Sequence, residues 1–524
     1  MKSLSVAATL ITAGILSIAS SEAYNILAIV PIRTKSHFMV IESVLKGLAE
    51  KGHNVTVVNV NPQKTPINNY HDIDISSQYP KHTVNSITID FILSNMKPIH
   101  EGLFFIWEYG FQLCSNAYKD QRVQNLINTT GKFDLVITEI FSSDCFVPFA
   151  YKLKVPLVSI VTSSALPWMN SRVGNPDNPS YLVNYASSFS PQMTFLERLE
   201  NFYFLSFAKI GYHFLSDNGA YKIAKQYFGE DLPHISQIYQ NTSLILVNSH
   251  FSINQARPFV PNVIEIGGIH LKEVASLPED FQILLDSAHN GAIIFSFGSI
   301  VRVSSFPENV RTAFTTAFSQ LKQLIIWKYE EELLTISPNV ILRKWIPQFD
   351  ILAHKNVKLL MTHGGQSSCI EAAYHGVPVI GIPLFADQPG NVKNLVNRGM
   401  AIHIDYFNIT ADTITHAIQT ILNDKSFKEN AEKVSQTFKD RERTPMESAI
   451  YWIEYVVRYK GAAHLQTSAN QLSAIQFYLL DIFAFLFVIF IATVLVLIKL
   501  LAIIAGSFKK SEGKHKHKSK KKSD

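Results

Sequence analysis

The sequence predicts an α/β protein with two doubly wound parallel sheets that face a cleft, followed by one C-terminal transmembrane helix. Three observations lead to this fold class. Apolar strand-like runs alternate with helical segments in two separate series, which is typical of parallel sheets covered by helices. An uncharged run, Ile482–Ile498, continues past Lys499 and is long enough to cross a bilayer. The chain of 524 residues also has room for two or three domains.

The first series of elements lies within residues 24–260, the expected N-terminal domain. Tyr24–Pro31 is predicted as a buried strand, Phe38–Glu50 as a helix with apolar residues at helical spacing, and Val55–Val60 as the next strand. Strand, helix and strand in this order form the unit from which parallel sheets are built. Three further strands are predicted, at Phe133–Ile140, Val155–Val161 and Ser243–Asn248.

The second series lies within residues 278–445, after a looser, proline-containing stretch that begins near Ala256. One helix is predicted at Asn309–Leu321. Doubly wound sheets bind ligands at the carboxyl ends of their strands, so two such domains face to face place an active site in the cleft between them. The predicted strands are Ala292–Phe297, Leu324–Trp327, Val340–Arg343, Val357–Met361 and Val379–Ile382.

The two ends of the chain predict its topology. Residues 1–23 are expected to be a signal peptide, with Tyr24 as the mature start; an uncleaved anchor is the alternative. Residues 446–477 are expected to form a C-terminal helix and linker, residues 478–505 the membrane span, and residues 506–524 a basic cytoplasmic tail. The sequence therefore predicts a single-pass type I protein of the endoplasmic reticulum, with its body in the lumen.

Charge is concentrated in the tail. Eight of the 47 Lys and Arg residues lie within residues 507–524, with two of the 42 acidic residues, so the rest of the chain is close to neutral. A nucleic-acid-binding body is not expected on that balance. Lys521 and Lys522 resemble a dilysine signal for retrieval to the endoplasmic reticulum; attraction to anionic lipids is the alternative. Four sequons fit a luminal body and predict glycosylation at Asn54, Asn128, Asn241 and Asn408.

Two local features bear on how the body is built. The three cysteines, Cys114, Cys145 and Cys369, form an odd and sparse set, which argues against a disulfide framework and excludes cysteine-rich zinc sites. The stretch Met193–Leu215 is rich in Phe, Tyr and Leu and has few charges. We expect it to be a core helix, with a helix lying in the membrane interface as the alternative.

The most informative stretch runs from Met361 to Pro389. A turn of two adjacent glycines, ending at Gly365, leads into a helix whose first backbone amides form an anion site suited to a diphosphate. Glu371 lies about two turns further along the helix, where its carboxylate could accept both hydroxyls of a ribose. Asp387 and Gln388 follow the next strand, at the mouth of the cleft, and could bind sugar hydroxyls.

This stretch resembles the signature of the UDP-glycosyltransferases, and the resemblance extends over the whole chain. Phe295–Ser299 is similar to that family's donor-side glycine turn, and Trp345–Gln348, followed by His354, is similar to its uracil-stacking segment. The arrangement looks most like the membrane-anchored animal members, the insect branch in particular. The resemblance implies the GT-B fold, two Rossmann-like domains with the donor on the C-terminal one.

The resemblance also implies roles for individual residues. Trp345 would be the uracil platform and His363 would contact phosphate, while Gln366 stands where many family members have Asn. The residues expected to bind the donor are Ser299, Trp345, Gln348, His363, Gly365, Gln366, Ser367, Glu371, Asp387 and Gln388.

The expected catalytic base comes from the other domain. His37 lies at the start of the first helix, whose positive end disfavours imidazolium and should keep the ring neutral. Its position matches the catalytic base of the family. Such a base needs a carboxylate on its other ring nitrogen. Two candidates follow the predicted strand: Glu139 at the strand end, and Asp144, which we favour because its residue type is the one expected from the family.

The chemistry expected is direct displacement at the anomeric carbon of an α-linked UDP-sugar, which gives a β-glycoside. Insect relatives mostly use UDP-glucose, so glucose is favoured over glucuronic acid, and the acceptor is expected to be small and lipophilic. A non-catalytic membrane partner or lipophile-binding protein is the alternative from another class. No metal and no cofactor is expected, because Asp72-Ile-Asp74 lies in a polar stretch of the wrong domain for a DxD element. Homo- or hetero-oligomers are both compatible with the sequence.

Overall fold

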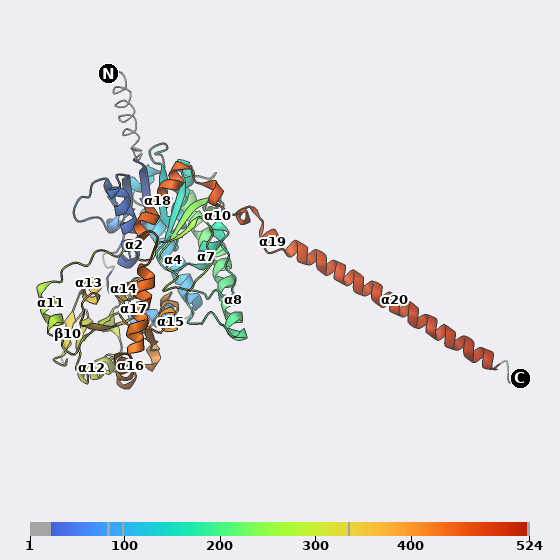
Figure 1. The fold of residues 1–524 in the computed structure, drawn as a ribbon. Helices are drawn as coiled ribbons and strands as arrows, with labels where there is room; N and C mark the ends of the chain where they lie inside the picture. The colour runs from blue at the N-terminus through green and yellow to red at the C-terminus, as the bar shows by residue number, and fades with distance from the viewer. Residues whose placement is uncertain (1–22, 81–83, 97–98, 334–335, 521–524) are drawn as a thin grey trace, which may run out of the picture. The chain divides into compact units, whose positions relative to one another are not determined.

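The computed structural model describes residues 23–80, 84–96, 99–333 and 336–520 (Figure 1). The chain divides into two compact units, Met1–Gln466 and Thr467–Asp524. The expected signal peptide, apart from Ala23, and the two lysines of the expected retrieval signal lie outside the described residues.

The first sheet of the larger unit has seven parallel strands in the order β3-β2-β1-β4-β5-β6-β7. Every residue of β4, β5 and β6 is buried, because a parallel sheet is covered by helices on both faces. These three buried and mostly apolar strands fall within runs that the sequence predicts as strands. The strands are β1 (Asn25–Ile29), β2 (Asn54–Asn59), β3 (Tyr70–Asp74), β4 (Leu135–Glu139), β5 (Leu157–Val161), β6 (Thr242–Val247) and β7 (Val263–Glu265).

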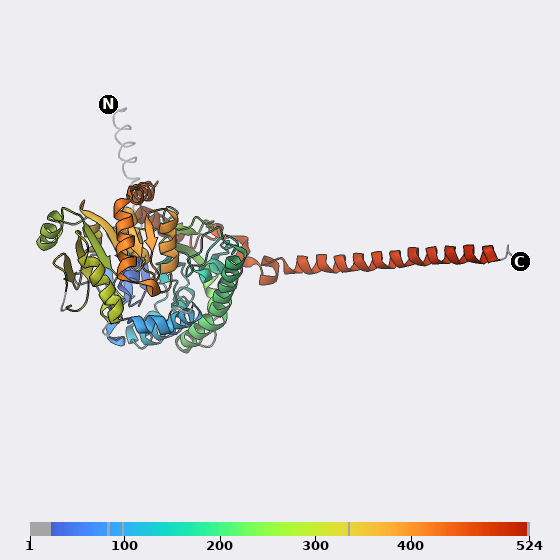
Figure 2. The same cartoon turned by 90° about the horizontal axis from the view of Figure 1, so that it is seen from below.

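Helices of the first half connect and cover these strands. The helices are α2 (Lys35–Glu50), α3 (Ile89–Asn95), α4 (Ile99–Ala117), α5 (Gln121–Leu126), α6 (Pro148–Leu153), α7 (Pro167–Val173), α8 (Phe195–Gly211), α9 (Asn218–Phe228) and α10 (Ile235–Tyr239). Seen from below, α4 in blue and α8 in green lie side by side (Figure 2). The expected core position of the stretch Met193–Leu215 is wrong in part, because α8 buries one face and exposes large apolar side chains on the other.

The second sheet has six parallel strands in the order β10-β9-β8-β11-β12-β13. Its strands are β8 (Ala292–Ser296), β9 (Leu324–Lys328), β10 (Val340–Arg343), β11 (Val357–Thr362), β12 (Val379–Gly381) and β13 (Ala401–His403). Its helices are α11 (Glu279–Asp286), α12 (Glu308–Ser319), α13 (Gln348–Leu352), α14 (Gln366–His375), α15 (Gln388–Asn397), α16 (Ala411–Asn423) and α17 (Lys425–Lys439). Both sheets reverse their strand order next to the first strand of the series, at β1/β4 and at β8/β11, and such reversal points create ligand crevices.

Two segments cross between the halves. Helix α3 places Ile89, Ile92 and Met96 in the apolar core of the second sheet. In the other direction α18 (Pro445–Arg458) returns to the first sheet and packs against α2 and β6. Its apolar side chains join the first core, and a capping box at Thr444 starts the helix. Each half therefore completes its core with residues from the other part of the chain.

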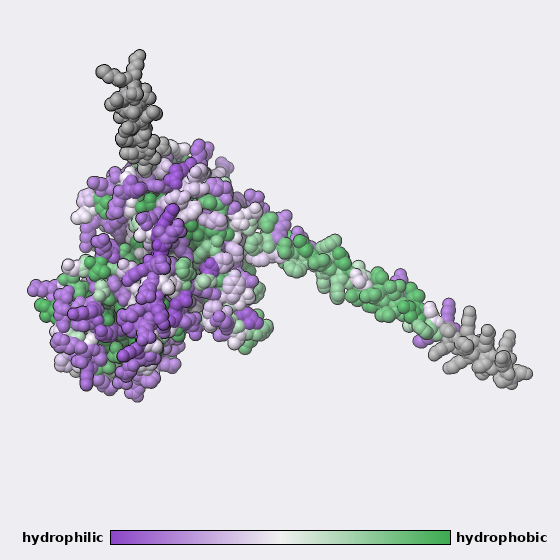
Figure 3. Space-filling model, in the orientation of Figure 1, coloured by the Kyte–Doolittle hydropathy of each residue, from purple (hydrophilic) through white to green (hydrophobic). Residues whose placement is uncertain are grey.

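The smaller unit contains α19 (Ala474–Phe477) and α20 (Leu480–Lys520). The segment Leu480–Lys510 of α20 is long and apolar enough to cross a membrane. Hydrophobic residues cover most of this helix, shown in green in Figure 3. The chain is accordingly a membrane-anchored protein.

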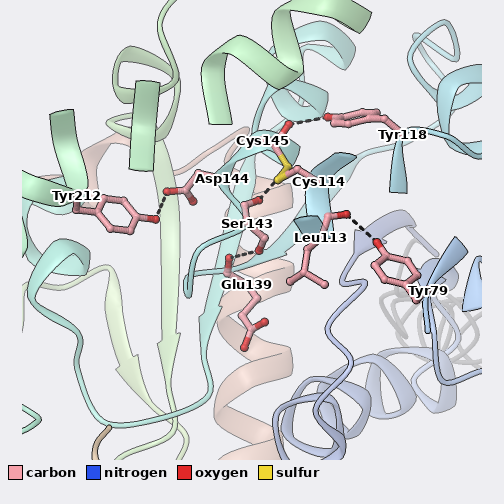
Figure 4. The surroundings of a disulfide bond; sticks show 9 residues. All are labelled: Tyr79, Leu113, Cys114, Tyr118, Glu139, Ser143, Asp144, Cys145 and Tyr212. Carbon is pink, nitrogen blue, oxygen red and sulfur yellow. Dashed lines mark hydrogen bonds between the residues drawn. A yellow bond between two sulfur atoms is a disulfide. The ribbon is translucent and has the colours of Figure 1, made fainter. Parts of the chain in front are cut away.

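A disulfide joins Cys114 of α4 to Cys145, which follows β4 (Figure 4). The sequence argues against a disulfide framework, and the structure has one bridge between two of the three cysteines, which the sequence analysis did not predict. The two residues are 31 positions apart in the sequence and meet only because α4 packs beside the end of β4. Cys369 is buried and free.

Candidate active site

A cavity of about 590 Å³ lies at the carboxyl ends of the strands of both sheets. This volume is within the range of roughly 300–1,000 Å³ that is usual for small-molecule sites. Residues of the first half that line it include His37, Phe91, Phe105, Tyr109 and Thr162. Residues of the second half that line it include Ser299, His363, Gly365, Asp387 and Gln388.

His37 belongs to the first turn of α2 and is held by a carboxylate. Its Nδ1 atom lies 2.7 Å from Oε1 of Glu139, the last residue of β4. The Thr162 hydroxyl donates to the same carboxylate oxygen at 2.9 Å, and the edge of the imidazole packs against Phe141. This arrangement places the proton on Nδ1, and Nε2 makes no hydrogen bond with any side chain that the structure describes.

The charges around His37 determine the direction in which the pKa of its ring is shifted. Burial lowers the pKa of the imidazole, but the charge and hydrogen bond of Glu139, with a contribution from Asp387, outweigh burial and raise it above its ordinary value. The start of α2 was expected to disfavour the charged ring, whereas the two carboxylates act in the opposite direction. Asp387, from the other half, lines the same cavity, and burial raises the pKa of its carboxyl group.

Asp144, the favoured partner of His37, has a different role. Glu139 and Asp144 point in different directions in Figure 4, and Asp144 is hydrogen-bonded to Tyr212. Its carboxylate also accepts hydrogen bonds from both terminal nitrogens of Arg172, and the one from Nη1 is 2.9 Å long. Both side chains of this pair are almost completely buried. The structure therefore places Glu139, and not Asp144, against His37.

The glycine turns make room for His363. A Cβ atom on Gly298 would lie 2.7 Å from Cε1 of His363, and one on Gly365 would lie 2.8 Å from Nε2 of the same ring. Gly364 has a φ of +83°, which favours glycine. Burial, aided by the charge of Lys328, lowers the pKa of His363 to about 4, so this ring is neutral at pH 7 and can donate one hydrogen bond to a phosphate.

The helix that follows the second glycine turn has an open N-terminus. No side chain caps α14, and Gly365, Gln366 and Ser367 line the cavity at its start. The Gln366 side chain is committed elsewhere, because its Nε2 donates to the Asn248 carbonyl at 3.0 Å and to Asn254 Oδ1 at 3.1 Å. Backbone amides, rather than the Gln366 side chain, are thus available to an anion here.

Asp387 and Gln388 begin α15 at the cavity wall. Asp387 accepts a hydrogen bond of 2.9 Å from Asn391. Gln388 Oε1 accepts from the backbone amides of Leu384 and Phe385, so only its amide nitrogen is left for a ligand. Ala386, which directly precedes Asp387, also lines the cavity.

Trp345, Gln348 and Glu371 do not line the cavity, but Gln348 donates at 3.1 Å to the hydroxyl of Ser368, which does. Gln348 Nε2 donates to Glu371 Oε2 at 2.6 Å, and burial raises the pKa of Glu371 to about 7. Trp345 is half exposed, and the ammonium of Lys35, from the first turn of α2, lies 4.4 Å from the centre of its ring. The expected uracil platform is thus covered by a residue from the opposite half of the cleft.

Several site features were not found from the sequence. Thr162 directly follows the predicted strand Val155–Val161, so its place at the same sheet edge as Glu139 was a usable signal. Arg172 and the crossing helix α3 left no such signal.

Asp72 of the Asp72-Ile-Asp74 element accepts hydrogen bonds from Asn59 and Gln63. Among the described residues no group of three or more His, Cys, Asp or Glu could hold a metal ion. The four sequon asparagines, Asn54, Asn128, Asn241 and Asn408, are exposed.

The cavity combines a histidine held by a carboxylate on one side with a helix start that no side chain caps on the other. His37 offers a free ring nitrogen, the glycine turns offer backbone amides, and Asp387, whose charge acts on His37, offers carboxylate oxygens as acceptors for hydroxyls. The remaining wall is largely apolar, with Phe91, Met96, Phe105, Ile106 and Leu166. Such a site can hold a phosphorylated polar ligand and remove a proton from an apolar one.

The fold is GT-B, and two solved glycosyltransferase structures share it. The chain is similar to a structure described as UDP-glucose: anthocyanidin 3-O-glucosyltransferase in complex with UDP, with a TM-score of 0.54 and 16% sequence identity. The match covers 83% of this chain and 99% of the other. A glycotransferase of kitacinnamycin matches with the same TM-score and 17% identity. At these identities the likeness shows the fold.

The family follows from the sequence comparisons. The family model described as UDP-glucoronosyl and UDP-glucosyl transferase matches residues 26–515. UDP-glucosyltransferase 2 of Dactylopius coccus is 42% identical over 90% of this chain and 92% of its own length. UDP-glucuronosyltransferase 2A2 of Homo sapiens is 30% identical over 86% and 87%. The chain belongs to the UDP-glycosyltransferase family, and it is an enzyme that transfers a glycosyl group from a UDP-sugar, its co-substrate.

The contact between Glu139 and His37 predicts a change in pH dependence. Glu139→Gln keeps the shape but removes the charge, so the burial of His37 then lowers its pKa. Because a base acts when deprotonated, the acid limb of the kcat/KM profile should move to lower pH while kcat falls by about tenfold or more. Asp144→Asn is the matched control: its acid limb should stay in place. A shift caused by Asp144→Asn alone would contradict the assignment.

Proposed function

We propose that the chain is an inverting transferase that moves glucose from UDP-glucose to a hydroxyl of a small lipophilic acceptor. The observation that carries this proposal is the His37–Glu139 pair, which faces Asp387 across one cavity. His37 Nε2 takes the proton of the acceptor hydroxyl. The acceptor oxygen then forms a bond to the anomeric carbon, and the bond from that carbon to the diphosphate oxygen breaks, with its electron pair leaving on UDP.

The remaining parts of the site fit this displacement. The start of α14 supplies amides for the charge that develops on the leaving diphosphate, with His363 and Ser299 beside it. Glu371 would hold the ribose, Trp345 the uracil, and Asp387 with the amide of Gln388 the transferred sugar. The apolar wall formed by Phe91, Phe105 and their neighbours would receive the acceptor. A concerted attack from the face opposite UDP yields the β-glycoside.

Glucose is the proposed sugar because a relative at 42% identity is named a UDP-glucosyltransferase, whereas relatives named UDP-glucuronosyltransferases, such as those of Homo sapiens and Canis lupus familiaris, are 29–30% identical. We further propose that the body lies in the lumen of the endoplasmic reticulum, in type I topology. The disulfide Cys114–Cys145 fits an oxidising compartment. The exposed sequon asparagines and the basic tail support the same orientation.

Product analysis tests the reaction. Microsomes from cells that express the chain would receive UDP-glucose, UDP-glucuronic acid and UDP-N-acetylglucosamine in parallel, with a panel of phenols. We expect conjugates from UDP-glucose. In their NMR spectra, the coupling constant between the anomeric proton and its neighbour on the sugar ring should show a β-linkage. Products from UDP-glucuronic acid instead would replace the proposed sugar, and an α-linked product would contradict the inverting mechanism.

A further inference from the structure

The outer face of α8 carries a stripe of large apolar side chains. Phe195, Leu199, Phe202, Ile210 and Phe214 follow one another at helical spacing, and between 54% and 69% of the surface of each is exposed. Leu196, Tyr203 and Leu215 broaden the stripe. At 1.5 Å per residue it runs for about 30 Å along the helix and its continuation. Hydrophobic colour at the outer end of α8 is visible in Figure 3.

The opposite face of α8 fixes the helix to the body. Asn201, Phe204 and Ala208 are buried, and Asn201 donates to the carbonyls of Pro179 and Leu182. Tyr212, just beyond the helix, stacks on Trp168 with ring centres 4.8 Å apart. The capping box of Thr194 with Glu197 defines the start of the helix. The exposed side chains are therefore held in place on a rigid support.

An apolar face of this size is unusual on a protein surface surrounded by water. Single exposed apolar residues are normal, but a contiguous group of eight marks a contact surface. Large Phe, Tyr, Leu and Ile side chains make up this face, while Lys209 of the same helix is paired with Asp177. A helix with such an apolar face can lie in a lipid interface.

The membrane anchor determines what the face can meet. The candidate span begins at Leu480, and the larger unit ends at Gln466. The segment between them, residues 467–479, could extend over at most about 45 Å even if fully stretched. The bilayer surface is consequently always within reach of the body, at a high effective concentration.

The side of α8 next to α4 lies near the wall of the cavity. On α4, Phe104 is partly exposed and its ring contacts Phe207 of α8, while the adjacent Phe105 lines the cavity and contacts Phe91. We propose that the outer face of α8, with Phe214 and Leu215, lies in the interface of the membrane that holds the anchor. This contact is independent of the transferase chemistry and depends only on the anchor.

Depth-dependent fluorescence quenching tests this contact on the full chain in phosphatidylcholine–phosphatidylserine vesicles. Leu199→Cys and Ile210→Cys would each carry an environment-sensitive fluorophore. The matched control is Thr312→Cys, at an exposed position of α12. Cys369 is buried and the other cysteines form the disulfide, so labelling is selective. Spin-labelled lipids should remove about half or more of the emission at positions 199 and 210, with little effect at 312.

Varying the protein density in the vesicles distinguishes a face covered by lipid from a face covered by a second copy of the chain. If lipid covers the face, quenching is the same at one chain per vesicle and at high density. If both positions are unquenched at every density, the proposal is overturned. Shielding that develops only at high density, without quenching by lipid, would assign the face to a second copy and would also overturn the proposal.

Discussion

His37→Ala is expected to lower kcat by about a thousandfold, because general base catalysis contributes roughly 10²- to 10⁴-fold. The affinity for UDP should stay within about twofold, because the anion site is built from the glycine turns and α14 of the other half and not from the base. Turnover with a phenol acceptor and UDP binding by calorimetry would be measured on the same detergent-solubilised preparation.

The matched control is His416→Ala, which removes an exposed histidine on α16. Its turnover and UDP affinity should both be unchanged. If His37→Ala keeps turnover within tenfold of the parent, the base must be another group. If the parent itself binds UDP but transfers no sugar to any acceptor, a non-catalytic lipophile-binding protein becomes the better description.

Arg172→Met is expected to cost about 3–5 kcal/mol in the free energy of unfolding, since it leaves a buried carboxylate without its cation. Asp144 is 2% exposed and Arg172 is fully buried, with the guanidinium also 4.3 Å from the ring centre of Tyr239. Urea unfolding of the full chain in detergent, followed by tryptophan fluorescence, would report the loss, because Trp168 stacks on Tyr212 in the same cluster.

Arg122→Met is the control for this pair. Arg122 binds Asp120 at 2.7 Å, but its side chain is 55% exposed, so its removal should cost about 1 kcal/mol or less. Adding Asp144→Asn to Arg172→Met should restore part of the stability, because the stranded charge is then gone. Equal costs for Arg172→Met and Arg122→Met would show that burial of the Asp144–Arg172 pair has little energetic weight.

Much of the fold could be predicted because buried parallel strands are continuous apolar runs. Strands such as β4, β5 and β8 are buried at every position, and hydrophobicity alone marks them. Strand β3 was missed because it is a polar edge strand. Strands β7 and β13 were missed because each is short and ends in a polar residue, Glu265 or His403, whereas the equally short β12 is entirely apolar.

The site was predictable where a residue's place follows from the end of a strand. His37, Glu139 and Asp387 each follow or end a strand at the expected sheet edge. The choice between Glu139 and Asp144 was not predictable, because it depends on Arg172. This residue is distant in the sequence and forms an ion pair with Asp144. The disulfide of Cys114 was missed for the same kind of reason, since its partner is set by packing.

The exchange of segments between the two halves limits how this enzyme can be recombined with its relatives. A hybrid that joins residues 1–277 of this chain to a relative's second half would place a foreign α18 on its own first sheet. It would also insert its own α3, with Ile89 and Ile92, into a foreign core. Both apolar cores would stay intact in such a hybrid only if α18 is exchanged together with the first half and residues 84–96 together with the second.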